Sequence, residues 1–281
     1  MKDKNITTLI RILLFYGLSM ISSLTLAQSK DGVFSDLSDF GELLLPPGTQ
    51  FTLGVGTRFG PDYVGSDDYE VSPDIAFFFR FGRKLTLTND GTSFDLLGGL
   101  KDISFGPVLR ITGGRDEYSN PALNGLGDIN ASLDLGVFTS FNVADQFSVR
   151  LRFFHAAAFG DNGGILDLRL RKLIYQTDQL SIALGLRSSW ATEQRVEQFF
   201  GITPKQAANS GLSVFSPTAS FQDIRLALGV RWALTENWSL NGFARFSRLL
   251  GDTADSPLVD PFGSNNQFSV GSFLAYRFEI K

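Results

Sequence analysis

The stretch DINASLDLGVFTSF, residues 128–141, alternates apolar and polar side chains along its length. The apolar set is Ile129, Ala131, Leu133, Leu135, Val137 and Phe141, and the polar set is Asp128, Asn130, Ser132, Asp134 and Ser140. Because successive side chains of a strand point to opposite faces, the pattern predicts a long strand with one apolar face and one wet face.

The same alternation recurs along most of the chain, in segments near the roughly 9–11 residues that a tilted strand needs to cross a bilayer. We expect about twelve strands, at residues 51–59, 70–81, 84–88, 92–98, 103–112, 128–142, 147–157, 165–175, 180–190, 221–234, 238–249 and 267–280. The segments around residues 84–98 are short for a full crossing. The predicted fold class is all-β, a closed antiparallel transmembrane β-barrel.

The connections between these segments alternate in length. If the first strand runs outward, the connections at 82–83, 100–102, 143–146, 176–179 and 235–237 lie on one side, and all are short. The other side receives residues 60–69, 115–127, 159–164, 191–220 and 251–266. Outer-membrane barrels have short periplasmic turns and longer extracellular loops. A soluble β-sandwich has no reason to segregate its loops in this way.

The longest of these loops contains one helix signal. Thr203-Pro204-Lys205-Gln206 has the pattern of an N-cap, an N1 proline and a capping-box glutamine, and Asn209 and Gly211 are stop signals. The helix is expected to cover the mouth of the barrel or to lie inside it. A surface turn without a binding role is the alternative.

The N-terminus has the pattern of a secretory signal peptide. Lys2 and Lys4 precede an apolar run at residues 12–21, and Thr25-Leu26-Ala27 offers small residues at the usual cleavage spacing. The alternative, a membrane anchor, would need about 20 apolar residues. We therefore expect a signal peptide at 1–27, a periplasmic segment at 28–48 and the barrel at 49–281.

Composition limits the partners. The 25 basic and 29 acidic residues become 22 and 28 once residues 1–27 are removed, a net charge of −6 that offers no surface for nucleic acid. The chain has no cysteine, which excludes a lipoprotein anchor, disulfides and thiolate metal sites. Mean hydropathy is +0.05, as expected when lipid-facing residues are averaged with lumen-facing ones.

Charged side chains dominate the predicted inner face. The proposed lumen charge network is Arg58, Arg80, Asp74, Arg110, Asp134, Arg150, Asp167, Arg169, Arg187, Asp223, Arg225 and Arg245. Further charged residues in or near that register are Arg152, Arg171, Arg231, Arg277, Glu70, Asp128 and Glu279. Guanidinium groups pair readily with carboxylates at close quarters. The pattern favours an interior filled by ion pairs, and the alternative is a pore that favours anions.

The sequence gives little support for catalysis, and no catalytic, cofactor-binding or metal-binding residue is predicted. The single histidine, His155, falls on the lipid-facing register, and Asp161 is the nearest acid in the sequence. A general base needs an acid and a nucleophile within hydrogen-bond reach. Acidic clusters at residues 67–68, 116–117 and 252–260 lack the spacing of a calcium loop and are expected to be solvated loop tips.

Several motifs resemble one family. The residues GVG at 54–56 and PDYVGSDDY at 61–69 resemble the first-hairpin signature of the MipA/OmpV family, the MltA-interacting proteins of the Gram-negative outer membrane. FFGIT at 199–203, QA at 206–207, SGL at 210–212 and GDTADSPLV at 251–259 resemble later motifs of that family. Together these motifs span nearly the whole mature chain.

The resemblance implies a non-enzymatic outer-membrane barrel that acts as a scaffold between a lytic murein transglycosylase and a murein synthase, with no cofactor. Other family members are linked to adhesion, stress response or antibiotic susceptibility, and a channel for small solutes or a hydrolase at His155 remain alternatives. The expected partners are outer-membrane lipid and the barrel-assembly machinery. The pattern Ser269-x-Gly271-x-x-Leu274-x-Tyr276 resembles the C-terminal signal that this machinery reads in its substrates. Typical signals end on an aromatic residue, whereas this chain continues to Lys281.

Overall fold

The structure is a computed structural model that describes residues 50–279, except residues 99, 101, 145, 161 and 162. It is a closed antiparallel barrel of twelve strands, in which β1 (Gln50–Pro61) pairs with β12 (Asn266–Glu279). This ladder joins Phe51 to Phe278 and Phe59 to Val270, so the predicted fold and its closure are confirmed. The expected signal peptide at 1–27 and periplasmic segment at 28–48 lie outside the described residues.

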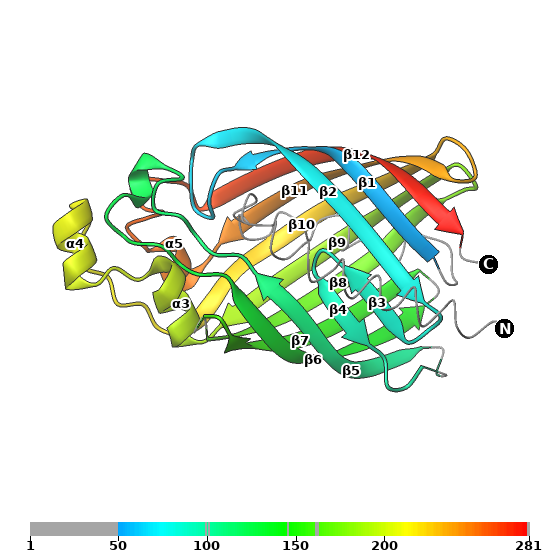
Figure 1. The fold of residues 1–281 in the computed structure, drawn as a ribbon, viewed down its shortest axis with the longest axis horizontal. Coiled ribbons are helices and arrows are strands. Elements are labelled where there is room, and N and C mark those ends of the chain that lie inside the picture. The colour runs from blue at the N-terminus through cyan, green and yellow to red at the C-terminus, as the bar shows by residue number, and fades with distance from the viewer. Residues whose placement is uncertain (1–49, 99, 101, 145, 161–162, 280–281) are drawn as a thin grey trace.

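Each remaining strand pairs with its neighbours in the sequence, and the barrel is strongly elongated along its strands (Figure 1). These strands are β2 (Tyr69–Phe81), β3 (Leu85–Thr88), β4 (Gly91–Phe94), β5 (Ile103–Thr112), β6 (Ser132–Ala144), β7 (Phe147–Ala158), β8 (Gly164–Gln176), β9 (Leu180–Ala191), β10 (Ser220–Ala233) and β11 (Trp238–Leu249).

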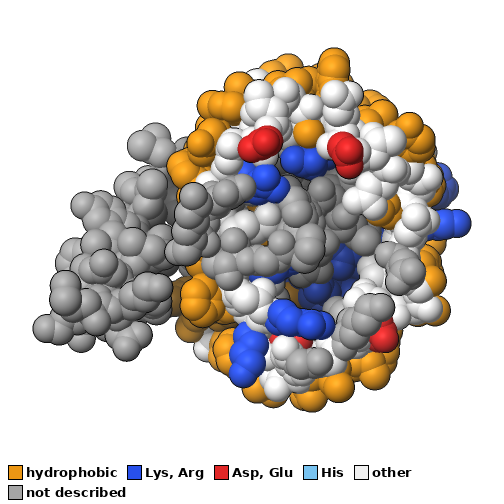
Figure 2. All heavy atoms as spheres, turned by 90° about the vertical axis from the view of Figure 1, so that its right-hand side faces the viewer, with side chains coloured by type: hydrophobic (Ala, Val, Ile, Leu, Met, Phe, Trp, Pro, Cys, Tyr) orange, Lys and Arg blue, Asp and Glu red, His pale blue; other side chains and the backbone are white. Residues whose placement is uncertain are grey.

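The two faces of the wall differ as the alternation predicts. On β6, Leu135 is 52% exposed on the outside, whereas Asp134 is 1% exposed on the inside. Hydrophobic side chains surround the outside of the barrel when it is viewed from the right-hand end of Figure 1, and lysine and arginine side chains appear inside it (Figure 2). An apolar outer belt around a polar interior is the arrangement that a strand-built membrane protein requires.

The start of β6 differs from the prediction. The strand begins at Ser132, and its pairing with β7 shifts register between Leu133 and Asp134. Before the strand, Ile129 is buried, whereas Asp128 is exposed and accepts a hydrogen bond from the Glu117 N–H. The expectation that Asp128 faces the lumen is therefore wrong, because Ile129 takes the inward side to pack on an apolar cluster at the mouth.

Loop lengths follow the predicted segregation with one exception. One end carries short connections at residues 82–84, 145–146, 177–179 and 234–237, and a longer one at 95–102, because β4 ends at Phe94. The other end, on the left of Figure 1, carries residues 62–68, 113–131, 159–163, 192–219 and 250–265 together with the helices. We call these the short-turn end and the mouth.

The mouth holds the predicted helix and others that were not predicted. The predicted helix is α4 (Pro204–Ser210), with a Thr203–Gln206 capping box and a left-handed Gly211 at φ 78°. Sequence reasoning missed α3 (Glu193–Phe200), α5 (Gly251–Ala254) and the 3₁₀ turn η2 (Pro121–Leu123). No helix of the described residues is long and apolar enough to span a membrane.

The mouth loops interlock. Two apolar clusters lie there, one around Val196 and Phe199 of α3 and one around Leu123 and Ile202. Hydrogen bonds join different loops, at Arg115 Nη1 to Phe199 O (2.8 Å), Ser256 Oγ to Phe200 O (2.7 Å), Gln206 Nε2 to Leu126 O (2.6 Å) and Asn120 Nδ2 to Asp62 Oδ2 (2.6 Å). The loops therefore form a packed cap.

One part of the wall is much shorter than the rest. The strands β3 and β4 have four residues each and meet at the turn Asn89-Asp90, part-way along the barrel (Figure 1). The predicted strand at 92–98 is wrong beyond Phe94, because Asp95 Oδ1 accepts from the N–H groups of Leu97 (2.9 Å) and Phe105 (3.2 Å) and turns the chain there.

Candidate functional site

The candidate site is the charged interior of the barrel. The structure places all twelve proposed network residues on the inner face of the strands, and seven of them are buried. The buried members are Arg58, Asp74, Asp134, Asp167, Arg169, Asp223 and Arg245. Side chains of a strand alternate between its two faces, and each of these residues lies at a position whose side chain points into the lumen.

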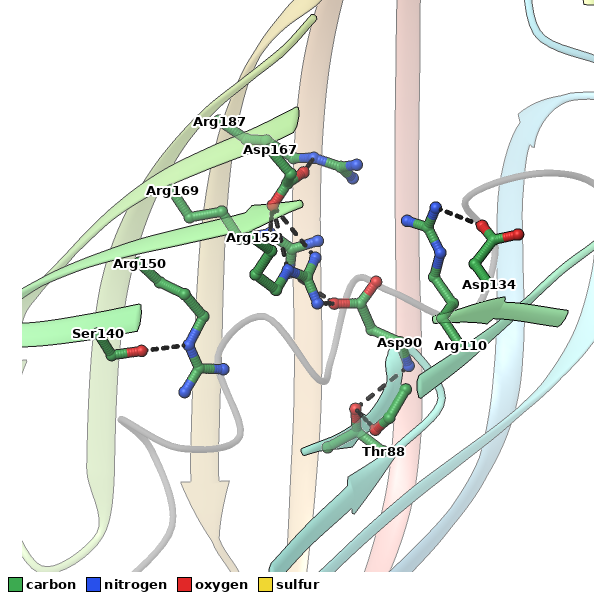
Figure 3. A network of polar contacts seen from close by, with 11 residues as sticks. Thr88, Asp90, Arg110, Asp134, Ser140, Arg150, Arg152, Asp167, Arg169 and Arg187 are labelled. Carbon is green, nitrogen blue, oxygen red and sulfur yellow. Dashed lines mark hydrogen bonds and ion pairs between the residues drawn. The ribbon is translucent and has the colours of Figure 1, made fainter. Parts of the chain in front are cut away.

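Asp167 is the centre of the largest cluster. Its carboxylate is completely buried and pairs with Arg152 Nη2 (3.1 Å) and Arg169 Nε (2.7 Å), and it also pairs with Arg187. These groups come from β7, β8 and β9 and converge on one carboxylate (Figure 3). Three guanidinium groups around one carboxylate leave a local excess of positive charge.

A second carboxylate reaches the same arginines from across the lumen. Asp90 Oδ2 pairs with Arg169 Nη1 (2.9 Å) and with Arg152 Nη1, which links the β3–β4 turn to β7 and β8. The Asp90 N–H donates to Thr88 Oγ1 (3.2 Å), which fixes the turn (Figure 3). Sequence reasoning used Asn89-Asp90-Gly91 only as a hairpin signal and missed Asp90 as a member of the network.

A third group surrounds Asp134. It accepts from Arg110 Nη2 (2.8 Å), Thr112 Oγ1 (2.6 Å) and Ser132 Oγ (2.7 Å). The Arg110 guanidinium also lies over the buried Phe154 ring, 4.0 Å from its centroid, and Arg152 lies 5.1 Å from the same ring. Phe154 therefore connects the Asp134 and Asp167 groups by cation–π contacts.

The remaining network residues lie around these clusters. Arg225 Nη2 pairs with Asp223 (3.0 Å), and Asp223 also accepts from the Ser189 hydroxyl. Arg245 Nη2 donates to Ser269 Oγ (2.9 Å), and Arg150 Nε donates to Ser140 Oγ (2.6 Å). The Arg80 guanidinium lies over the Phe78 ring at 5.0 Å. These contacts are local, so the network consists of several clusters.

On the outer face, the described residues form no comparable charged cluster. His155 is exposed there, and its Nδ1 lies 2.9 Å from Ala156 O. Its nearest acid in the sequence, Asp161, lies outside the described residues. Within the described ranges no group of three or more His, Cys, Asp or Glu side chains could hold a metal ion.

Comparison with known proteins settles the family. The sequence profile of the MltA-interacting protein MipA matches residues 53–278, from β1 to β12. The chain belongs to the MipA family. MltA-interacting protein of Escherichia coli K12 is 33% identical over 86 residues, which cover 31% of this chain and 34% of that protein. Outer membrane protein OmpV of Vibrio cholerae is 24% identical over 82% of this chain and 87% of its own length.

Among solved structures, the MipA-family barrel is similar to the NanC porin, with 9% identity, a TM-score of 0.44, and coverage of 82% of this chain and 100% of that one. A bacterial polysaccharide outer membrane secretin gives 9% identity, a TM-score of 0.44, and coverage of 83% and 100%. Likenesses of this degree carry no information about function. Family membership and the lipid-facing belt make this MipA-family chain an outer-membrane protein.

Proposed function

We propose that this protein is a non-enzymatic outer-membrane scaffold that holds a lytic murein transglycosylase, and through it a murein synthase, beneath the membrane. The observation that carries the proposal is the interior, where Asp90 and Asp167 tie the β3–β4 turn to β7, β8 and β9. Buried ion pairs of this kind hold a barrel in one shape, which suits a docking platform better than a wide conduit.

The name of the E. coli relative, MltA-interacting protein, supports the choice of partner. The short-turn end is the side on which a periplasmic enzyme would dock, if the long loops face outward as in other outer-membrane barrels. Three separate short turns there each present an exposed carboxylate, at Asp102, Asp178 and Glu236. We propose that these carboxylates contribute to the docking surface.

The test is a binding measurement with a purified MltA-type transglycosylase and the mature barrel in detergent. The triple variant Asp102→Lys, Asp178→Lys, Glu236→Lys is expected to weaken binding. The matched control reverses three exposed carboxylates at the mouth, Asp67→Lys, Asp255→Lys and Asp260→Lys, and should bind as the parent does. Lack of binding by the parent barrel would overturn the scaffold role.

An anion-favouring channel is the second candidate, because a cavity of about 190 Å³ on the mouth side is lined by six arginines and two aspartates. Single-channel conductance in a planar bilayer separates the two. The scaffold proposal expects no steady conductance from the parent protein. A conductance that disappears in Arg187→Gln and favours chloride over potassium would establish the channel instead.

A further inference from the structure

The barrel wall has a lateral opening on its mouth side. Residues 69–77 of β2 have ladder partners only on β1, and residues 110–112 of β5 have them only on β6. The β3–β4 hairpin fills the space between these strands only as far as the Asn89-Asp90 turn (Figure 1). Beyond that turn the described residues place no strand between the two edges.

The β2 edge is adapted to this arrangement. Asn89 continues the β2 ladder with its side chain, since Oδ1 accepts from Phe77 N–H (2.7 Å) and Nδ2 donates to Ile75 O (3.0 Å). Pro73 lies two residues before Ile75, so its backbone nitrogen also faces the opening. Because proline has no N–H, this position leaves no donor without a strand partner.

A positively charged cavity lies behind the opening. Arginines of β1, β5, β9, β10, β11 and α3 line it, together with Asp90 and Asp223. Asn89 and Ile111, at the rim of the opening, line the same cavity. Its volume of about 190 Å³ is well above what a single water molecule needs, which leaves room for a small polar head group.

Arg58 is the side chain best placed to bind an anion in this cavity. It is 3% exposed, it lines this cavity, and its Nε and Nη2 atoms have no hydrogen-bond partner among the described residues. Gly60 makes room for it, because a Cβ there would lie 2.6 Å from Arg58 Nη1. Arg225 Nη1 is likewise buried without a partner. Buried cationic donors are costly unless an anion satisfies them.

We propose that the opening admits the head group of a phosphorylated acyl lipid from the outer leaflet, with its phosphate bound by Arg58 and Arg225. The acyl chains would stay outside, along the exposed apolar side chains of Ile75 and Ile111 at the two edges. Arginine is well suited to this ligand, because its planar fork of donors matches phosphate oxygens. The outer leaflet follows from the mouth facing outward. This lipid site is independent of the scaffold role.

Lipid retention by the purified mature protein tests the head-group site. Native mass spectrometry from detergent should show one phosphatidic acid retained per barrel and no phosphatidylcholine of the same chain length. Arg58→Gln should weaken retention about tenfold or more, as for the loss of a charge-assisted contact. Arg231→Gln is the matched control, because it faces inward on β10 away from the cavity, and it should retain lipid as the parent does.

The lateral route is tested by placing a photo-crosslinking amino acid at Ile111. In bilayers, Ile111 should crosslink phosphatidic acid in preference to phosphatidylcholine, and Arg58→Gln should remove that preference. Leu135, equally outward but on the fully paired β6, should crosslink both lipids alike in either background. Equal crosslinking of both lipids at Ile111 would overturn the proposal.

Inorganic phosphate separates the two sources of the anion. The lipid proposal expects free phosphate at millimolar concentration to leave phosphatidic acid retention nearly unchanged, because the acyl chains add affinity that the free ion lacks. Full displacement of the lipid by free phosphate would show a site for a soluble anion and would overturn lateral entry.

Discussion

The two sides of the barrel wall are built differently. From β6 to β12 every strand has 12 to 14 residues, whereas β3 and β4 have four each. Both sides nevertheless deliver a carboxylate to Arg152 and Arg169: Asp167 from within β8, and Asp90 from the tip of the short hairpin. The interior network therefore does not require a continuous wall, since a turn that stops inside the barrel reaches the lumen as well as a strand does.

The largest effect is expected where β12 pairs with β1 and closes the barrel. The double variant Tyr276→Asp, Phe278→Asp places two carboxylates on the lipid face of β12, where Phe278 stacks on Phe51 at 5.4 Å. Each change costs up to about 2–4 kcal/mol, and less near the interface, so we expect barrel assembly to fail. The measurement is the amount of heat-modifiable protein in the membrane.

The control for that variant is Asn130→Asp with Asn266→Asp, two exposed positions at the mouth, which should assemble normally. Normal amounts of the β12 double variant would show that the assigned lipid face of the closing strand is wrong.

The next effect compares the two carboxylates directly. Asp167→Asn leaves three guanidinium groups around a neutral amide, two of them buried, and we expect a loss of about 3–5 kcal/mol in the free energy of unfolding. Asp90→Asn should cost less, about 1–3 kcal/mol, because its two partners, Arg152 and Arg169, still pair with Asp167. Urea unfolding in lipid vesicles measures both. Equal losses would mean that the short hairpin is held as rigidly as the long wall.

A smaller and local effect is expected at the edge of the opening. Asn89→Ala removes the two hydrogen bonds to Ile75 and Phe77 and should cost about 1–2 kcal/mol. The rate of amide hydrogen exchange should rise in residues 69–77 of β2 and at the tip of the β3–β4 hairpin, while β8 to β11 stay protected. Asn130→Ala, exposed at the mouth, serves as the control. Exchange that rises equally around the whole barrel would contradict an independent short side.

The last effect concerns pH at the mouth, and it is absent near neutral pH. Burial, followed by the charge of Asp62, raises the pKa of the Tyr63 phenol from 10.0 to about 12. The unfolded chain therefore loses this proton at a lower pH than the folded chain does, and the stability that the neutral phenol contributes declines as pH rises from 10 to 12. Thermal unfolding followed across that range should show a smaller decline for Tyr63→Phe. An identical decline would assign the pH dependence to other groups.

Alternation made most of this fold predictable. A lipid belt and a wet lumen impose a period of two on every long strand, so the inward positions of Asp167, Arg169 and Arg187 follow from sequence. The α4 helix was equally predictable, because Thr203, Pro204 and Gln206 form a local capping signal.

What sequence could not predict depends on tertiary contacts. Asp90 lies in a turn, where no periodicity indicates whether a side chain points inward or outward. The helix α3 has no side-chain hydrogen bond at its Thr192 N-cap, and it is held by packing of Val196 and Phe199 on residues far away in the chain. Asp128 and Ile129 continue the alternation of β6 in the sequence, but in the structure Ile129 is buried and Asp128 is exposed. The cause is again a tertiary contact, because Ile129 packs in the cluster that contains Val196 and Phe199.

If the mouth faces outward, as the loop lengths predict, the interlocked mouth limits how this protein could vary at the cell surface. Loops that pack on one another through Arg115, Ser256 and Gln206 cannot change length independently, because each supplies a partner to another. Sequence change driven by phages or antibodies should therefore be confined to tips such as Tyr118 and Phe262, which are 79% and 60% exposed. The same tips are where a foreign epitope could be inserted for surface display without opening the cap.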